Sequence, residues 1–195
     1  MLLNIDNIPT IKGYDKIVLA GNLTKPAGYL PEFPKTLYEF TTLKEQGKLP
    51  KLTPQLLNWF WRMVKASLVN KGLGVAAVQI GLQKNMFVIQ ESDKVFRVYI
   101  HPTYSVDSSS VVINEEEACL SVPKLSLIVP RNSVILASWF EFNENEELVY
   151  KNELLEGMYA KVFQHETDHN LAISIIDRTN ELNRAKKRTL LKSLR

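Results

Sequence analysis

The feature that most limits the fold is a run of short β-type segments between residues 86 and 150 with no helical pattern among them. Each segment is rich in β-branched and aromatic residues. The predicted strands are Met86–Gln90, Val95–His101, Val111–Asn114, Leu125–Pro130, Val134–Phe142 and Leu148–Tyr150. Parallel neighbours need long crossover connections, so strands that follow one another this closely are expected to pair antiparallel.

A helix is predicted on each side of this strand region. The first has Thr53 as a favourable N-cap, Pro54 at its first position and Gly72 as its C-terminal stop. The second spans about Glu153–Ile175, and Gly157 within it suggests close backbone packing. We therefore expect the α+β fold class, with antiparallel strands packed around a central helix, the second one.

The two ends of the chain differ from this regular middle part. Five prolines interrupt the first 50 residues, which predicts an irregular N-terminal wrap over 1–50 with short strands, one of them at Lys16–Ala20. Residues 177–195 hold seven Lys/Arg and two Asp/Glu, so this basic C-terminal helix or tail carries +5 in a chain of net charge +3. A length of 195 residues is that of one domain, expected over 1–195.

The composition excludes several classes of protein. Cys119 is the only cysteine, so no intramolecular disulfide can form. No stretch reaches the roughly 18 apolar residues that a membrane span needs, and the start lacks a leader pattern, so we expect a cytoplasmic protein without membrane contact. The basic tail is expected to be a solvated helix face. Contact with an acidic partner such as the ribosome stays open, without sequence-specific nucleic-acid binding.

The most specific motif is His165-Glu166-Thr167-Asp168-His169, in the second predicted helix. Two histidines four residues apart lie on one helix face and can bind one metal ion. Glu166 is placed to reach a water molecule beside the metal rather than the metal itself, and can act there as general base and acid. Two structural histidines are the alternative, which the presence of only three histidines in the chain disfavours.

A catalytic metal site needs a third protein ligand and an open position. Cys119 is the obvious candidate, in the segment 116–121 (Glu-Glu-Ala-Cys-Leu-Ser) between two predicted strands. A buried cysteine without a role is the alternative. The segment 72–79 (Gly-Leu-Gly-Val-Ala-Ala-Val-Gln) follows the first helix, where its glycines allow close backbone approach to a ligand and Gln79 supplies an amide donor.

Together these three segments resemble the three motifs of the peptide deformylase family, and their order and spacing agree with it over about 53–178. The resemblance implies a metalloenzyme that removes the N-formyl group from formyl-methionyl nascent polypeptides and releases formate. It implies that Cys119, His165 and His169 hold one divalent metal ion, Fe2+ in the cell with Zn2+, Ni2+ or Co2+ as replacements. Glu166 would be the general base and acid.

The resemblance also implies contacts with the substrate. The Gln79 side chain and the backbone N–H of Leu120 would stabilise the oxyanion that forms on the formyl oxygen. Gly74 and Ala118 would lie along the bound peptide, and Val162 would line the methionine pocket.

Four residues depart from the family pattern. Where this chain has Ala118 and Ala172, the family usually has glycine. Where it has Asn170 the family usually has leucine, and where it has Ser126 many bacterial members have arginine. None of them removes a ligand or the base. Two alternatives stay open: a metallohydrolase of the same fold that acts on another N-acyl or peptide amide, and a non-catalytic ribosome-binding homologue.

Overall fold

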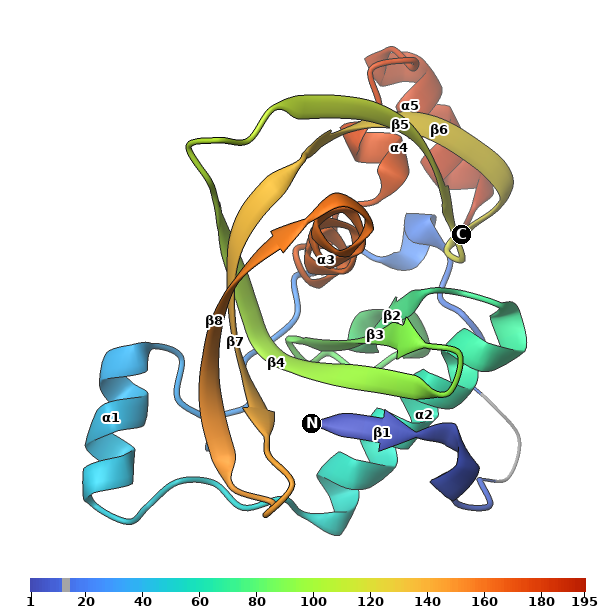
Figure 1. The fold of residues 1–195 in the computed structure, drawn as a ribbon. Helices are drawn as coiled ribbons and strands as arrows, with labels where there is room; N and C mark the ends of the chain where they lie inside the picture. The colour runs from blue at the N-terminus through green and yellow to red at the C-terminus, as the bar shows by residue number, and fades with distance from the viewer. Residues whose placement is uncertain (12–14) are drawn as a thin grey trace.

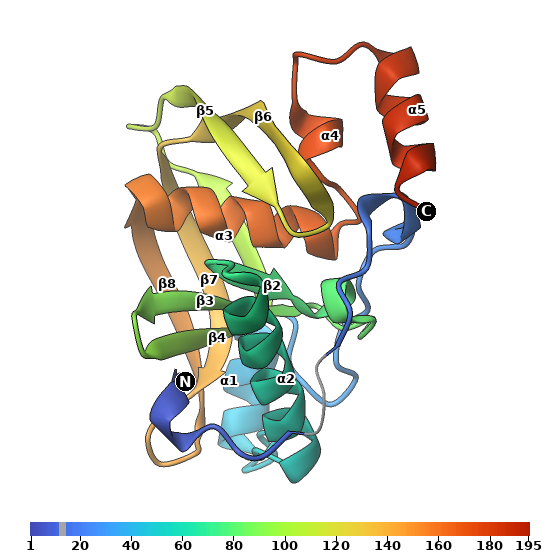
Figure 2. The ribbon, with the colours of Figure 1, turned by 90° about the vertical axis from the view of Figure 1, so that its right-hand side faces the viewer.

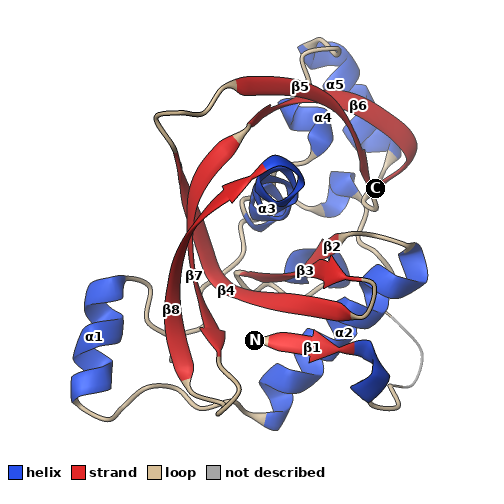
Figure 3. Ribbon diagram, viewed as in Figure 1, coloured by secondary structure: helices blue, strands red, loops and turns tan. Residues whose placement is uncertain are grey.

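The chain is described by a computed structural model over residues 1–11 and 15–195. Antiparallel strands curve around one central helix, α3, seen nearly end-on in Figure 1 and by element type in Figure 3. The helices are α1 (Leu37–Glu45), α2 (Pro54–Asn70), α3 (Gly157–Asn170), α4 (Ile175–Arg178) and α5 (Arg184–Ser193), with 3-10 turns η1 (Ile5–Asn7), η2 (Ala20–Asn22) and η3 (Ala77–Ile80). None of the helices in the described residues is long and apolar enough to cross a membrane.

The strands form two sheets. They are β1 (Leu2–Asn4), β2 (Gly74–Ala76), β3 (Met86–Ser92), β4 (Val95–Val106), β5 (Val112–Cys119), β6 (Val122–Asn132), β7 (Val134–Phe142) and β8 (Leu148–Glu156). The larger sheet has the order β2-β3-β4-β7-β8 with β1 paired to β4, and the smaller consists of β5 and β6. Every pair of these strands is antiparallel, as predicted. Helix α3 lies between β5–β6 and the β2-β3-β4 part of the larger sheet (Figure 2), which confirms the predicted α+β class.

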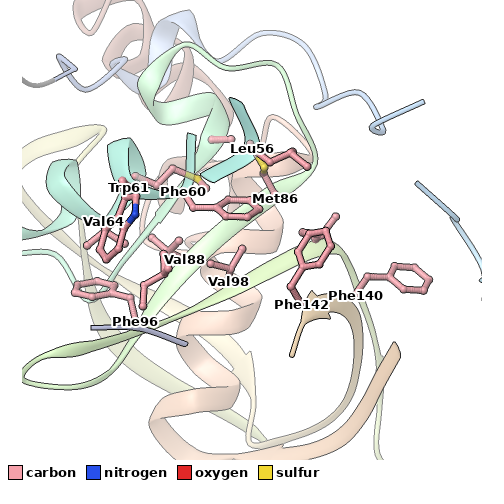
Figure 4. Close-up of a cluster of buried hydrophobic side chains, with 14 of the residues drawn as sticks. Leu56, Phe60, Trp61, Val64, Met86, Val88, Phe96, Val98, Phe140 and Phe142 are labelled. Atoms are coloured by element: carbon pink, nitrogen blue, oxygen red, sulfur yellow. The ribbon is translucent and has the colours of Figure 1, made fainter. Parts of the chain in front are cut away.

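The larger sheet is buried on both faces where β3 and β4 run side by side. One face meets α2 in the apolar cluster of Figure 4, to which the sheet contributes Met86, Val88, Phe96 and Val98. The alternate residues face α3, where Phe163 lies edge-on to Phe87 and Tyr99 with ring centroids 5.2 and 5.4 Å away. Burial on both faces explains the uninterrupted apolar run in β3, and it fixes the position of α3.

His101 in β4 holds the N-terminal segment against the larger sheet through its side chain. His101 has a left-handed backbone (φ 49°) where the pairing of β4 with β7 shifts register. Its buried ring donates from Nδ1 to the Pro34 carbonyl (2.9 Å) and accepts at Nε2 from the Leu30 N–H (2.8 Å). Burial lowers the pKa of His101, which favours this neutral form. The third histidine of the chain therefore has a structural role.

Three secondary-structure predictions are wrong. The N-terminal wrap contains a helix, α1, which was not predicted because prolines interrupt this part of the sequence. Lys16–Ala20, predicted as a strand, contains none. The second long helix begins at Gly157 because residues 153–156 complete β8, paired with β7 over its full length. This helix ends at Asn170, and Ile175, the predicted end, instead begins the separate short helix α4.

Two backbone positions near the ends of α3 adopt left-handed dihedrals. Gly157 has φ 56°, and a Cβ there would meet no atom of the described residues within 4 Å, so the predicted close packing is wrong. The glycine instead permits the left-handed backbone at the junction between β8 and α3. Ala172 has φ 59°, which explains why glycine is usual at this position in the resembled family. Asn170 is buried, and its Nδ2 donates to Asn85 Oδ1 at 2.8 Å.

The substitution Ala172→Gly should raise the free energy of unfolding by about 0.5–1 kcal/mol. The left-handed backbone costs a residue with a Cβ about 1–2 kcal/mol, which outweighs the extra chain entropy of glycine, about 0.5–1 kcal/mol. Denaturant unfolding measures the change. Ala185→Gly, the same substitution within α5, is the control and should not stabilise the protein; an equal gain in both variants would contradict the strain at Ala172.

Candidate active site

Three side chains from two distant parts of the chain meet beside α3. Cys119 ends β5, and His165 and His169 lie one turn apart on α3. His169 Nε2 is 3.3 Å from Cys119 Sγ and 3.2 Å from His165 Nε2, and the three donor atoms lie within 4.8 Å of one another. Burial alone would raise the pKa of the Cys119 thiol, but the adjacent His169 and His165 lower it well below its usual value. One thiolate and two imidazoles fit a single divalent ion such as Fe2+ or Zn2+.

Glu117 orients His165 within this group. The Nδ1–H of His165 donates to Glu117 Oε2 at 2.9 Å, so the Nε2 lone pair faces Cys119 and His169. Arg131 donates to both oxygens of Glu117, at 2.8 and 3.0 Å. Burial alone would raise the pKa of Glu117, but the hydrogen bonds from His165 and Arg131 lower it to about 2. Glu117 is therefore a buried carboxylate that fixes the ring orientation.

Asp168 extends these ion pairs to a second arginine. Arg131 Nη1 lies 2.6 Å from Asp168 Oδ2, and Arg178 donates to the same carboxylate at 2.6 and 3.0 Å. The network joins β5, β6, α3 and α4. This role of Glu117, Arg131 and Asp168 was not predicted from the sequence; the available signal was that two of them are acidic residues close to the expected ligands Cys119 and His169.

Glu166 lies against the backbone of Gly74. A Cβ on Gly74 would be 2.8 Å from Glu166 Oε1 and 2.9 Å from the Val88 carbonyl oxygen, so no larger residue fits. Gly74 therefore permits a close approach of β2 to Glu166. Glu166 is 3% exposed, its Oε2 has no hydrogen-bond partner among the described residues, and burial raises its pKa. Such a carboxylate is suited to accept a proton.

Gln79 is fixed by the two segments around it. Its Oε1 accepts from the Ala76 N–H at 2.9 Å, and its Nε2 donates to Ser121 Oγ at 3.2 Å. The main-chain carbonyls of Gln79 and Ser121 accept from the N–H groups of Val18 and Ala20, both at 2.8 Å. The N-terminal segment, to which the sequence assigned no role, therefore ties the two segments together.

A cavity of about 660 Å³ opens beside these groups. It is lined by the end of α2, β2, the β5–β6 pair and α3, and includes Cys119, His165, Glu166 and Gln79 with the expected substrate contacts Gly74, Ala118, Leu120 and Val162. Ala118 is exposed and paired with Ser126 in the sheet, and it is not among the residues with left-handed backbone. The backbone there does not require glycine.

Comparison with known proteins agrees with this arrangement. The sequence profile of the polypeptide deformylase family matches residues 38–185. A peptide deformylase of Thermotoga petrophila is 33% identical over 143 residues, which cover 73% of this chain and 84% of that protein.

Solved structures extend the similarity to the fold. A peptide deformylase from Thermotoga maritima has 29% identity and a TM-score of 0.62, over 86% of this chain and 99% of that one. A peptide deformylase from Synechococcus elongatus, in complex with actinonin, has 22% identity and a TM-score of 0.66 over 94% and 89%, which bears on the fold alone. The motifs, the match over most of the chain and the common fold agree: this chain belongs to the peptide deformylase family.

Proposed function

We propose that this chain removes the N-formyl group from formyl-methionyl nascent polypeptides and releases formate. The observation that carries the proposal is the buried Glu166 carboxylate beside the Cys/His/His group. Its Oε2 has no hydrogen-bond partner within residues 1–11 and 15–195. A module that only binds has no need for a buried proton acceptor at such a group.

The reaction assigns a role to each polar group. Cys119, His165 and His169 hold one divalent ion, Fe2+ in the cell, with Zn2+, Ni2+ or Co2+ able to replace it. When bound, the ion polarises the formyl carbonyl and lowers the pKa of water. Glu166 takes a proton from the attacking water and returns it to the nitrogen of the departing peptide. The raised pKa of Glu166 supports both transfers.

Two donors are proposed for the oxyanion on the formyl oxygen: the Gln79 side chain and the Leu120 backbone N–H. Gln79 Oε1 accepts a hydrogen bond from the Ala76 N–H, so the Gln79 side-chain amide is oriented with its nitrogen, the donor, available to other groups. One hydrogen of that nitrogen serves Ser121, which leaves the second for the substrate. Both Gln79 and Leu120 line the cavity.

The peptide is proposed to lie between β2 and β5. β2 is an outer strand of the larger sheet, and among the described residues β5 pairs only with β6, so each strand has an edge that an extended peptide can join. Gly74 and Ala118 stand on these two strands. Met158 and Val162 supply apolar lining from α3, which suits a methionine side chain.

We further propose that residues 1–195 act as one domain in the cytoplasm, in N-terminal methionine processing during protein biosynthesis. Helix α5 carries most of the positive charge of the tail, and Arg184, Arg188 and Lys192 share one exposed face because they are four residues apart. This face suits transient contact with the ribosome. Neither a membrane nor a specific nucleic-acid sequence is proposed as a partner.

The substitution Glu166→Gln tests the proposed reaction. Metal content should stay near that of the wild type because Glu166 is not a ligand, while formate release from a formyl-methionyl peptide should fall by about 10²–10⁴-fold with the loss of the proton acceptor. Metal analysis and a formate assay on the same sample measure both. Near-normal turnover in this variant would rule out the assigned role.

A reciprocal pair of substitutions tests whether glycine is required at the two positions beside the proposed peptide, Gly74 on β2 and Ala118 on β5. Gly74→Ala should reduce formate release at least 100-fold, since its Cβ would displace Glu166 from its position. Ala118→Gly should leave kcat/KM within about twofold, because Ala118 already has ordinary strand backbone. Steady-state kinetics measure both variants. A several-fold gain for Ala118→Gly would show that its methyl group crowds the substrate.

A further inference from the structure

The cavity beside the site has an uneven distribution of charge. Three lysines line it, each from a different element: Lys71 directly after α2, Lys124 in β6 and Lys161 in α3. The carboxylates in its lining are Glu116, Glu117 and Glu166.

Two of these six charged groups, Lys161 and Glu117, are paired within the protein. Lys161 Nζ donates to Glu115 Oε2 at 2.8 Å and to the Glu116 carbonyl at 3.0 Å. Glu117 is paired with Arg131, and Glu166 is buried beside the Cys/His/His group. The solvent-exposed charges that remain in the lining are the two ammonium groups of Lys71 and Lys124 against the single carboxylate of Glu116.

Lys71 and Lys124 share two further properties. Both have left-handed backbone, with φ of 56° and 63°. At Lys71 this conformation forms the C-cap of α2, and at Lys124 it accompanies the register shift between β5 and β6. Neither ammonium group makes an ion pair or a hydrogen bond with any residue in the part of the chain that the structure describes. Both are therefore free to meet an anionic ligand.

The two lysines also flank the strands between which the peptide is proposed to lie. Lys71 is three residues before Gly74 on β2, and Lys124 is two residues before Ser126, which pairs with Ala118 on β5. A peptide that extends along Gly74 and Ala118 therefore lies in a cavity whose lining also includes Lys71 and Lys124.

We propose that Lys71 and Lys124 determine specificity by favouring formyl-methionyl peptides with acidic side chains at the second and third residues. The inference rests on the proposed function and names a substrate class for it. Exposed ammonium groups attract carboxylates by modest amounts that depend on salt. We therefore expect a preference of about three- to tenfold rather than an absolute requirement.

The test compares three C-terminally amidated peptides: formyl-Met-Glu-Glu, formyl-Met-Gln-Gln and formyl-Met-Lys-Lys. Amidation removes the terminal carboxylate, and Glu and Gln have the same shape. In the wild type at low salt, kcat/KM should follow the order Glu, Gln, Lys, with Glu over Gln by about three- to tenfold. The difference should reside mainly in KM and should shrink as NaCl is raised.

Variants locate the preference. Lys71→Gln and Lys124→Gln should each reduce the Glu-to-Gln ratio, and the double variant should bring it close to one. Lys44→Gln is the matched control: it makes the same change of charge on α1, which is outside the cavity lining, and should keep the wild-type ratio.

Each result separates this inference from the proposed function. No formate from any of the three peptides in the metal-loaded wild type would contradict the function itself. Turnover of all three with equal kcat/KM, or a ratio that persists in the double variant, would overturn the specificity role while leaving deformylation intact. The salt dependence in the wild type tests the inference even if the double variant does not fold.

Discussion

The structure depends on the buried ion pairs around Arg131. This arginine, on β6, holds the carboxylates of Glu117 on β5 and Asp168 on α3 at 2.6–3.0 Å. The smaller sheet is thereby fixed against the central helix, and with it Cys119 against His165 and His169. Removing one partner of such a buried pair costs about 3–5 kcal/mol because the other charge is left unpaired. Here the network has a second effect, since Glu117 also sets the tautomer and orientation of His165.

A second constraint acts on the opposite side of α3. Gly74 lets β2 approach so closely that Glu166 is desolvated, and desolvation raises the pKa of its carboxyl group. The same helix thus offers His165, whose ring is oriented by Glu117, and Glu166, a carboxyl group whose surroundings favour proton transfer. These adjacent positions on α3 contact different sheets: His165 bonds to Glu117 on β5, and Glu166 lies against Gly74 on β2.

Much of this arrangement could be predicted from the sequence, since it rests on local patterns. The spacing of His165 and His169 places both on one helix face, and the succession of apolar strands implies an antiparallel sheet. The errors have physical causes. Residues 153–156 are predicted as the start of a helix, whereas pairing with residues 16 to 22 positions earlier, in β7, holds them in β8. The roles of Arg131 and of the hydrogen bonds from Val18 and Ala20 depend on contacts between residues 14 to 101 positions apart, which no local pattern encodes.

The most direct test of the account is a metal titration of the metal-free wild-type protein, prepared without oxygen. Formate release from formyl-Met-Ala-Ser should rise in proportion to added Fe2+ and stop rising at one equivalent per chain, while acetyl-Met-Ala-Ser should give no comparable hydrolysis. Turnover that is independent of metal would contradict the central role of the Cys/His/His group. Equal hydrolysis of the acetyl peptide would show that the chain acts on N-acyl amides in general.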